Sequence, residues 1–225
     1  MYLRLPIAEE TNNRVQMYLR LPIAEPKQII GFKCSVKSLF FDRDLTYFTR
    51  EVQYQMKQGT FFFITDDFFK KHDMDGRLMK NKDGIHNRPC FYAFPDKKEP
   101  NIFWCVPISS QIEKFERIVH NKISKQMEKG YKTPKCNTIR FGEVLGQKRA
   151  FLIQNMFPVT AAYVFATYID KNTKNPVTIA PDTEKDIVTN AREILKLVFR
   201  GYNNLVFTDI QKTYADLIAE LHPGH

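Results

Sequence analysis

The sequence predicts an α+β protein, built from short strands paired through hairpin-length loops and from amphipathic helices. Residues 61–64, 90–94 and 102–106 are short apolar runs without a helical period, which is typical of strands. Later stretches carry apolar residues three and four apart, which is typical of helices packed on a core. Because the loop of residues 95–100 joins two strands directly, antiparallel pairing is favoured over a parallel βαβ arrangement.

The composition is that of a globular, basic protein. Of the 225 residues 43% are hydrophobic, and 34 basic against 25 acidic residues give a formal net charge of +9, which favours a polyanionic partner. No apolar run approaches the roughly 18 residues of a membrane-spanning helix, and the N-terminus lacks the apolar core of a signal peptide. The four cysteines form no C-x-x-C pair, so a reducing cytosol is expected and a zinc site is not.

Two identical segments stand near the N-terminus. Residues 1–9, MYLRLPIAE, recur without change as residues 17–25. A solenoid would need at least about three copies of a longer unit, so no repeat architecture is expected. We predict an unstructured N-terminal extension over residues 1–55 and a folded domain over residues 56–225. The alternatives for the first segment are a genuine extension with a recent duplication, or a cloning scar.

The folded domain is predicted to begin with the strand at residues 61–64. Thr65 is placed to cap a short helix whose first turn contains Asp66 and Asp67, where carboxylates suit the helix dipole. Residues 76–87 are polar and basic and should form an exposed loop. That loop is either simply solvated or a phosphate-contacting edge of a nucleic-acid groove.

Residues 101–130 contain the most informative turn of the sequence. Pro107 should end the strand at 102–106 because it has no N–H to donate. Ser110-x-x-Glu113 matches a capping box, and Gly130 is placed to end the helix that follows. One face of this helix carries the apolar residues Ile112, Phe115, Val119, Ile123 and Met127.

Two hydroxyls, Ser109 and Ser110, therefore stand where a strand turns into a helix. The N–H groups of the first turn and the positive end of the helix dipole make such a position a ready phosphate site. Lys114, four residues after Ser110, can lie on the same helix face. The simpler interpretation is that Ser110 is only a helix cap and Lys114 only a solvated lysine.

The C-terminal half is predicted to add three strands and three helices. The strands are expected at residues 138–144, 150–154 and 176–180, with a turn at Gly146 between the first two. The helices are expected at residues 160–168, from a cap at Asp182 to Gly201, and from a cap at Thr208 onward.

Four stretches of the domain, in order, resemble the toxins of type III toxin–antitoxin systems, the ToxN/AbiQ/CptN/TenpN superfamily. They are residues 60–69 (TFFFITDDFF), 88–94 (RPCFYAF), 106–114 (VPISSQIEK) and 141–156 (FGEVLGQKRAFLIQNM). No single motif is decisive, but their order and gaps are specific, and the Ser-Ser turn is nearest to the CptN and TenpN branches. The resemblance extends from residue 56 to the C-terminus.

This resemblance implies a compact, partly open antiparallel SH3-like β-barrel of the PemK/MazF type with packed helices. It implies a metal-independent endoribonuclease without a cofactor, in which the 2′-hydroxyl attacks the adjacent phosphate and leaves 2′,3′-cyclic phosphate ends. It further implies a bacterial cytoplasmic toxin that acts on cellular or phage RNA, in phage defence or locus maintenance. A tandem-repeat RNA antitoxin would inhibit it in a cyclic assembly of protein and RNA, and the N-terminal duplication would be a read-through of the upstream antitoxin repeats.

The resemblance also assigns candidate site residues. Ser109 and Ser110 would act on the scissile phosphate and its proton transfers, with Lys114 stabilising charge. ToxN has a lysine where this chain has Ile112, and the candidates to replace it are Lys114 from the next turn, Arg88, Lys148 and Arg149. An aromatic residue lines the RNA site of these toxins near Phe68, which is a core residue in the simpler interpretation. The expected RNA-binding residues are Phe68, Arg88, Tyr92, Gln111, Arg117, Lys148, Arg149 and Asn155, with Tyr92 and Phe68 as stacking surfaces.

Two other function classes compete with this one. A basic SH3-like domain could bind RNA or DNA and cut nothing. A serine hydrolase is disfavoured because no G-x-S-x-G motif and no matching histidine spacing are visible. Analysis of the ends of RNA products separates a nuclease from a binding module.

Overall fold

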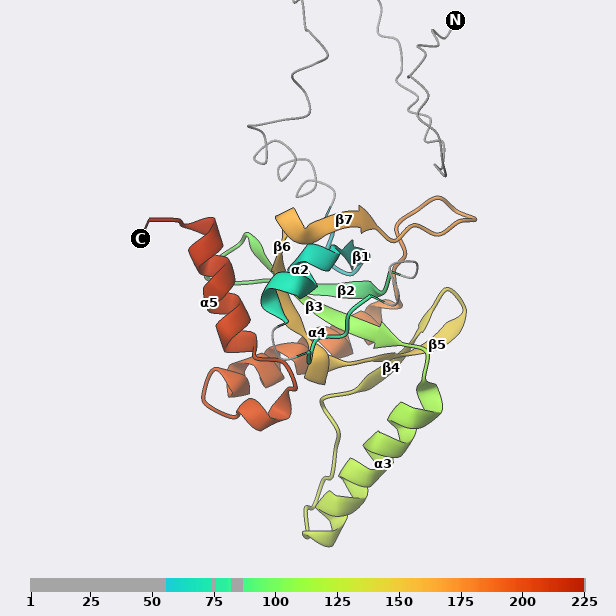
Figure 1. Ribbon diagram of the computed structural model, residues 1–225. Coiled ribbons are helices and arrows are strands. Elements are labelled where there is room, and N and C mark those ends of the chain that lie inside the picture. Colours follow the sequence, from blue (N-terminus) through green and yellow to red (C-terminus); the bar gives the residue numbers. More distant parts are fainter. Residues whose placement is uncertain (1–55, 74–75, 82–86, 225) are drawn as a thin grey trace, which may run out of the picture. The chain divides into compact units, whose positions relative to one another are not determined.

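Seven antiparallel strands form one sheet in the computed structural model, which describes residues 56–73, 76–81 and 87–224 (Figure 1). The strands are β1 (Phe61–Ile64), β2 (Pro89–Pro95), β3 (Ile102–Ser109), β4 (Arg140–Val144), β5 (Gln147–Phe151), β6 (Phe157–Thr160) and β7 (Val164–Thr167). The α-helices in the described residues are α2 (Asp66–His72), α3 (Ile112–Glu128), α4 (Pro181–Val198) and α5 (Ile210–Leu221). The predicted α+β class and antiparallel pairing are confirmed, whereas the predicted extension over residues 1–55 lies outside the described residues.

The sheet is open. Its strand order is β4-β5-β3-β2-β1-β7, with β6 pairing to β3 beside this path, so the sheet does not close into a barrel. Nothing in this order identifies the SH3-like barrel that the resemblance implied. None of the described helices is long and apolar enough to cross a membrane.

Strand β3 lies at the centre of the pairing. It pairs with β2 along one side, and on the other with β6 near its start and with β5 at Ile108 and Ser109. The strand therefore continues past Pro107, where the sequence predicted its end. Although Pro107 has no N–H to donate, its carbonyl accepts a hydrogen bond from the Leu152 N–H at 2.9 Å, so the residue still takes part in the backbone bonding of the sheet.

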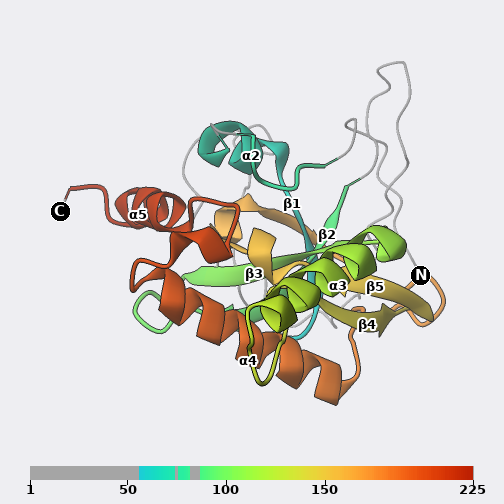
Figure 2. The same cartoon turned by 90° about the horizontal axis from the view of Figure 1, so that it is seen from below.

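Both faces of the sheet are buried, so its side chains form two cores. Phe61 and Trp104 pack on one face with residues of α4, whereas their neighbours Phe62 and Phe103 pack on the other with residues of α2. Figure 2 shows α2 and α4 on opposite sides of the sheet. Because successive strand residues face opposite sides, covering both faces requires the continuous apolar runs seen in the sequence.

Helix α3 is held by a separate, smaller apolar cluster near β5 and projects from the sheet (Figure 1). The Lys122 ammonium donates to Thr138 Oγ1 and Gln154 Oε1, each at 2.8 Å, and burial lowers its pKa. Met127, expected on the packed face, is 62% exposed. Gly130 follows the helix in the left-handed conformation, φ 74°, as predicted.

Several predicted elements of the C-terminal half are wrong. Residues 160–168 form no α-helix, because β6 pairs with β3 and β7 with β1, joined by the 3₁₀ turn η3 (Ala161–Tyr163). The strand predicted at 150–154 is β5, which ends at Phe151 and is followed by η2 (Ile153–Asn155). Residues 176–180 contribute only single bridges through Pro176 and Thr178.

The predicted helix caps are displaced along the chain. Helix α4 begins at Pro181, whose fixed φ suits the first helical position, so Asp182 lies inside the first turn. Helix α5 is capped by Asp209, which accepts the Lys212 N–H at 3.0 Å. The Thr208 hydroxyl instead donates to the Met156 carbonyl at 2.8 Å.

The carboxylate of Asp96 links α5 to the strand pair β2–β3 through hydrogen bonds. Asp96 accepts from Trp104 Nε1 at 2.9 Å and from the Tyr214 hydroxyl at 3.0 Å, while the two rings stack at 6.0 Å with an angle of 7°. Burial, followed by the bond to Asp96, raises the pKa of Tyr214 to about 12. The hydroxyl is therefore a donor at every physiological pH.

We expect Tyr214→Phe to lower the free energy of unfolding by about 1–2 kcal/mol, because the ring still stacks while Asp96 loses a donor. Urea unfolding measures the change. Tyr202→Phe is the matched control, since Tyr202 is 58% exposed and its hydroxyl has no hydrogen-bond partner among the described residues. Equal stability of both variants and the parent protein would show that the bond contributes nothing.

A buried histidine lies between α2 and α5. The side chain of His72 is 1% exposed, with Nε2 3.1 Å from Glu220 Oε1 and Nδ1 3.9 Å from Asp216 Oδ2. Burial lowers its pKa below the usual 6.5, against the opposing effect of these two carboxylates, and the nearby Lys71 and Lys212 lower it further. His72 is therefore neutral in the folded protein at neutral pH.

Because the folded-state pKa is depressed, His72 contributes stability that is fully present above pH 6.5 and is lost as pH falls below it. Below pH 6.5 the histidine is protonated in the unfolded chain but stays neutral in the folded chain, so acid favours unfolding. We expect urea unfolding to show a smaller loss between pH 7.5 and 5.5 in His72→Gln than in the parent protein. His120→Gln, which removes an exposed histidine, is the control; equal pH dependence in both variants contradicts the assignment.

Candidate functional site

A cavity of about 640 Å³ opens where β3 runs into α3. Its walls come from the start of β2, the end of β3, the first turn of α3, the β4–β5 hairpin and the segment after β7. The lining residues are Met79, Asn87, Arg88, Pro89, Ile108, Ser109, Ser110, Gln111, Lys114, Phe115, Val144, Leu145, Gln147, Arg149 and Tyr168.

The sheet register brings these distant segments together. The pairs Ile108–Phe151 and Ser109–Ala150 place β5 beside the end of β3, and the pair of Cys90 with Pro107 places the start of β2 on its other side. Arg88, two residues before Cys90, consequently donates through Nη1 to the Ile108 carbonyl at 3.4 Å.

The two serines differ in their surroundings. Ser109 is 7% exposed, and its Oγ accepts the Gln111 N–H at 3.2 Å. Ser110 is exposed, and its hydroxyl has no hydrogen-bond partner in the described part of the chain. Gln111, not Ser110, occupies the N-cap position, without a side-chain cap bond, so the predicted capping box is wrong. The Ser110 hydroxyl is thereby left at the cavity wall without a described hydrogen-bond partner.

Three cations line the cavity: Arg88, Lys114 and Arg149. Arg149 donates to the Gln147 side chain, and the buried Nε of Arg88 has no partner among the described residues. The described lining contains no aspartate, glutamate or histidine. The cavity therefore has a positive potential that favours an anion.

Two of the predicted cations lie outside this lining. Lys148 Nζ pairs with Glu116 Oε1 at 2.7 Å and stands over the Phe141 ring at 5.2 Å. Arg117 is exposed on α3. Of the cations that the sequence offered in place of the lysine missing at Ile112, the structure brings Arg88, Lys114 and Arg149 to the serines, together with the predicted Gln111.

The predicted stacking surfaces and one predicted polar contact are buried elsewhere, which corrects the sequence analysis. Phe68 is 0% exposed and packs against Phe157, and Tyr92 is 4% exposed and packs against Phe103. Both belong to the core under α2, so neither ring offers a face to a base. Asn155, 8% exposed in η2, is not in the lining either.

Tyr168 lines the cavity together with the buried Phe115, and sequence reasoning missed it. It follows β7 directly, and its ring meets those of Phe61 and Phe63 edge-on, at 6.4 and 5.5 Å. The sequence signal was an aromatic residue between an apolar run and the polar turn at 170–175. The helix predicted over residues 160–168 masks this signal.

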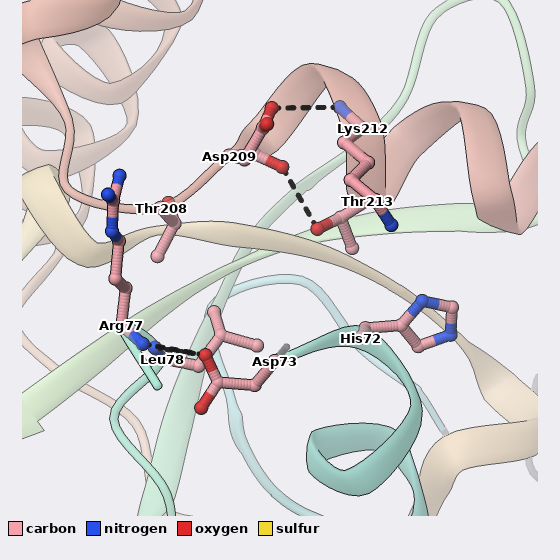
Figure 3. A pocket seen from close by; sticks show the side chains of 8 residues that line it. All are labelled: His72, Asp73, Arg77, Leu78, Thr208, Asp209, Lys212 and Thr213. Atoms are coloured by element: carbon pink, nitrogen blue, oxygen red, sulfur yellow. Dashed lines mark hydrogen bonds between the residues drawn. The ribbon is translucent and has the colours of Figure 1, made fainter. Parts of the chain in front are cut away.

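A second, smaller cavity of about 50 Å³ lies between the end of α2 and the start of α5 (Figure 3). It has room for a few water molecules. Its carboxylates are already engaged: Asp73 Oδ1 accepts the N–H groups of Arg77 and Leu78, and Asp209 caps α5. Among the described residues no three His, Cys, Asp or Glu side chains gather as a metal site.

No family model matches this sequence, and no curated protein matches it significantly. A solved structure is similar in fold, that of AbiQ, described as a lactococcal anti-phage endoribonuclease belonging to the type-III toxin-antitoxin system. The match covers 73% of this chain and 99% of the AbiQ chain, with a TM-score of 0.51 and 12% identity. At this identity the likeness shows a shared fold, and AbiQ belongs to the superfamily that the four sequence stretches resemble.

Proposed function

We propose that this protein is the toxin of a type III toxin–antitoxin system and cleaves RNA in the cavity at the end of β3. One observation carries the proposal: two serines and three cations meet in a cavity whose described lining has no acidic side chain. Such a lining selects a phosphate-containing ligand. The fold shared with an endoribonuclease of this kind makes RNA the favoured polyanion.

The lining has the two kinds of surface that a nucleotide requires. Arg88 and Arg149 offer guanidinium groups, which suit phosphate oxygens, and Lys114 adds a third charge from the first turn of α3. Tyr168 offers an aromatic face for an unpaired base. A single-stranded segment can therefore place its phosphates against the cations and one base against Tyr168.

The proposed reaction is an internal transfer at phosphorus. The 2′-oxygen of the nucleotide bonds to the adjacent phosphorus and loses its proton, the P–O5′ bond breaks, and the departing 5′-oxygen takes up a proton. The products are a 2′,3′-cyclic phosphate and a 5′-hydroxyl. A serine hydroxyl both donates and accepts, so Ser110 can relay the proton while Ser109 holds the turn through Gln111.

Charge on the phosphorane would be stabilised by Lys114, with Arg88 and Arg149 beside it. We further propose that the reaction is independent of a metal ion, because these side chains supply positive charge where other nucleases use metals. The same cations would bind the tandem-repeat RNA antitoxin. The toxin would act in the bacterial cytoplasm, and its biological role would be phage defence. Assignment to the CptN or TenpN branch rests on the Ser-Ser turn alone.

A second candidate function is RNA binding without cleavage. The absence of a carboxylate and an imidazole from the described lining favours it, because these are the usual proton-transfer groups. One experiment distinguishes the two functions. The full chain is incubated with single-stranded RNA in excess EDTA, and cyclic phosphate ends identify the nuclease, while intact bound RNA identifies the binding module.

We expect Ser110→Ala to lower the rate of RNA cleavage about 100- to 1,000-fold, the usual effect of losing one donor to a developing charge. Its stability should stay near that of the parent protein, because the Ser110 hydroxyl makes no described hydrogen bond. Ser124→Ala makes the same change on α3 outside the cavity and should cleave normally. Normal cleavage by a folded Ser110→Ala protein would remove this serine from the reaction.

Arg149 and Lys148 are neighbours that differ in one respect: Arg149 lines the cavity, whereas Lys148 is paired with Glu116. We expect Arg149→Gln to weaken binding of single-stranded RNA and to reduce the salt dependence of log Kd by about one. Lys148→Gln should change both values less. Equal effects of the two substitutions in a salt titration would show that RNA responds to net charge and not to the cavity.

A further inference from the structure

The β4–β5 hairpin turns through two residues that have unusual backbone angles. Val144 pairs with Gln147, which leaves Leu145 and Gly146 as the loop, with φ of 49° and 71°. Two central residues with positive φ define a type I′ turn, which matches the twist of a hairpin. Glycine adopts this conformation freely, but leucine does not.

Leucine is a poor choice for the first position of such a turn. Asn, Asp and Gly are strongly preferred there. The other described non-glycine residue with positive φ is Lys174, at 60°, in a polar exposed turn. Leu145 does not compensate through burial, because it is 48% exposed. Neither turn geometry nor packing accounts for this side chain.

The place of Leu145 offers an explanation. It lines the 640 Å³ cavity on the same hairpin as Arg149, and the two serines and Lys114 belong to the same lining. An exposed apolar side chain thus stands at the wall of a cationic cavity. A ligand that satisfies both must combine negative charge with an apolar face, and a nucleotide has both in its phosphate and its base.

We propose that Leu145 contacts the face of an unpaired RNA base next to the scissile phosphate and helps to select the cleavage sequence. The inference rests on the proposed nuclease function. The base must be unpaired, because stacking inside a duplex covers its faces. The turn fixes the backbone of Leu145, so the contact costs little ordering of the protein when RNA binds.

Leu145→Asn separates this role from a role in the turn. Asn-Gly is a favoured type I′ pair, so the variant should unfold at the same urea concentration as the parent protein or higher. On a random-sequence RNA pool, kcat/KM should fall about tenfold, the scale of one lost apolar contact. Sequencing of the 5′-hydroxyl ends should show a broader set of cleavage sites.

Two controls accompany it. Leu145→Met keeps an apolar side chain in the turn and should retain the parent cleavage sites. Lys174→Asn makes a similar change at the other described non-glycine residue with positive φ, which is not in the lining, and should leave the sites unchanged. If the full-length parent protein cleaves and Leu145→Asn produces the same sites at the same kcat/KM, the base contact is refuted alone. If the parent protein cleaves no RNA, the proposed function and this inference fail together.

Discussion

One buried strand, β3, supports both the core and the cavity. All eight of its residues are buried, and it pairs with β2, β5 and β6. Its side chains enter the apolar clusters on both faces of the sheet. Its last residue, Ser109, is the first residue of the turn into α3. The position of the two serines is thus a direct product of the packing that holds the sheet together.

The cavity gathers like charges that do little for folding. Arg88, Lys114 and Arg149 come from three different elements and meet without an acidic partner in the described lining. Elsewhere on the same hairpin and helix, Lys148 and Glu116 form an ion pair. Since unpaired like charges repel each other, this distribution is better explained by an anionic ligand than by stability. The buried, unpartnered Nε of Arg88 points the same way.

The sequence was sufficient where a local pattern and the tertiary structure agree. The strand at 61–64, the helix over 112–128 and the grouping of Ser109, Ser110 and Lys114 follow from short-range signals. Phe68 is a core residue, which is the simpler of the two interpretations that the sequence allowed, whereas Tyr92 was placed wrongly. The sequence did not separate these cases, because an aromatic strand or helix residue looks the same whether its face is covered or open. Tyr168 was missed because β6 and β7 owe their conformation to pairing with β3 and β1, which a local pattern does not reveal.

Because β3 is buried, the backbone and the side chains of the cavity wall move on different timescales. Core strands open at free energies close to that of global unfolding, so β3, which ends at Ser109, holds the start of the turn in place. Lys114 is exposed, and exposed side chains change rotamer in picoseconds to nanoseconds. A ligand entering the cavity would therefore meet a fixed turn beside a mobile lysine, and the reorganisation of this wall on binding would fall on the lysine side chain and not on the backbone.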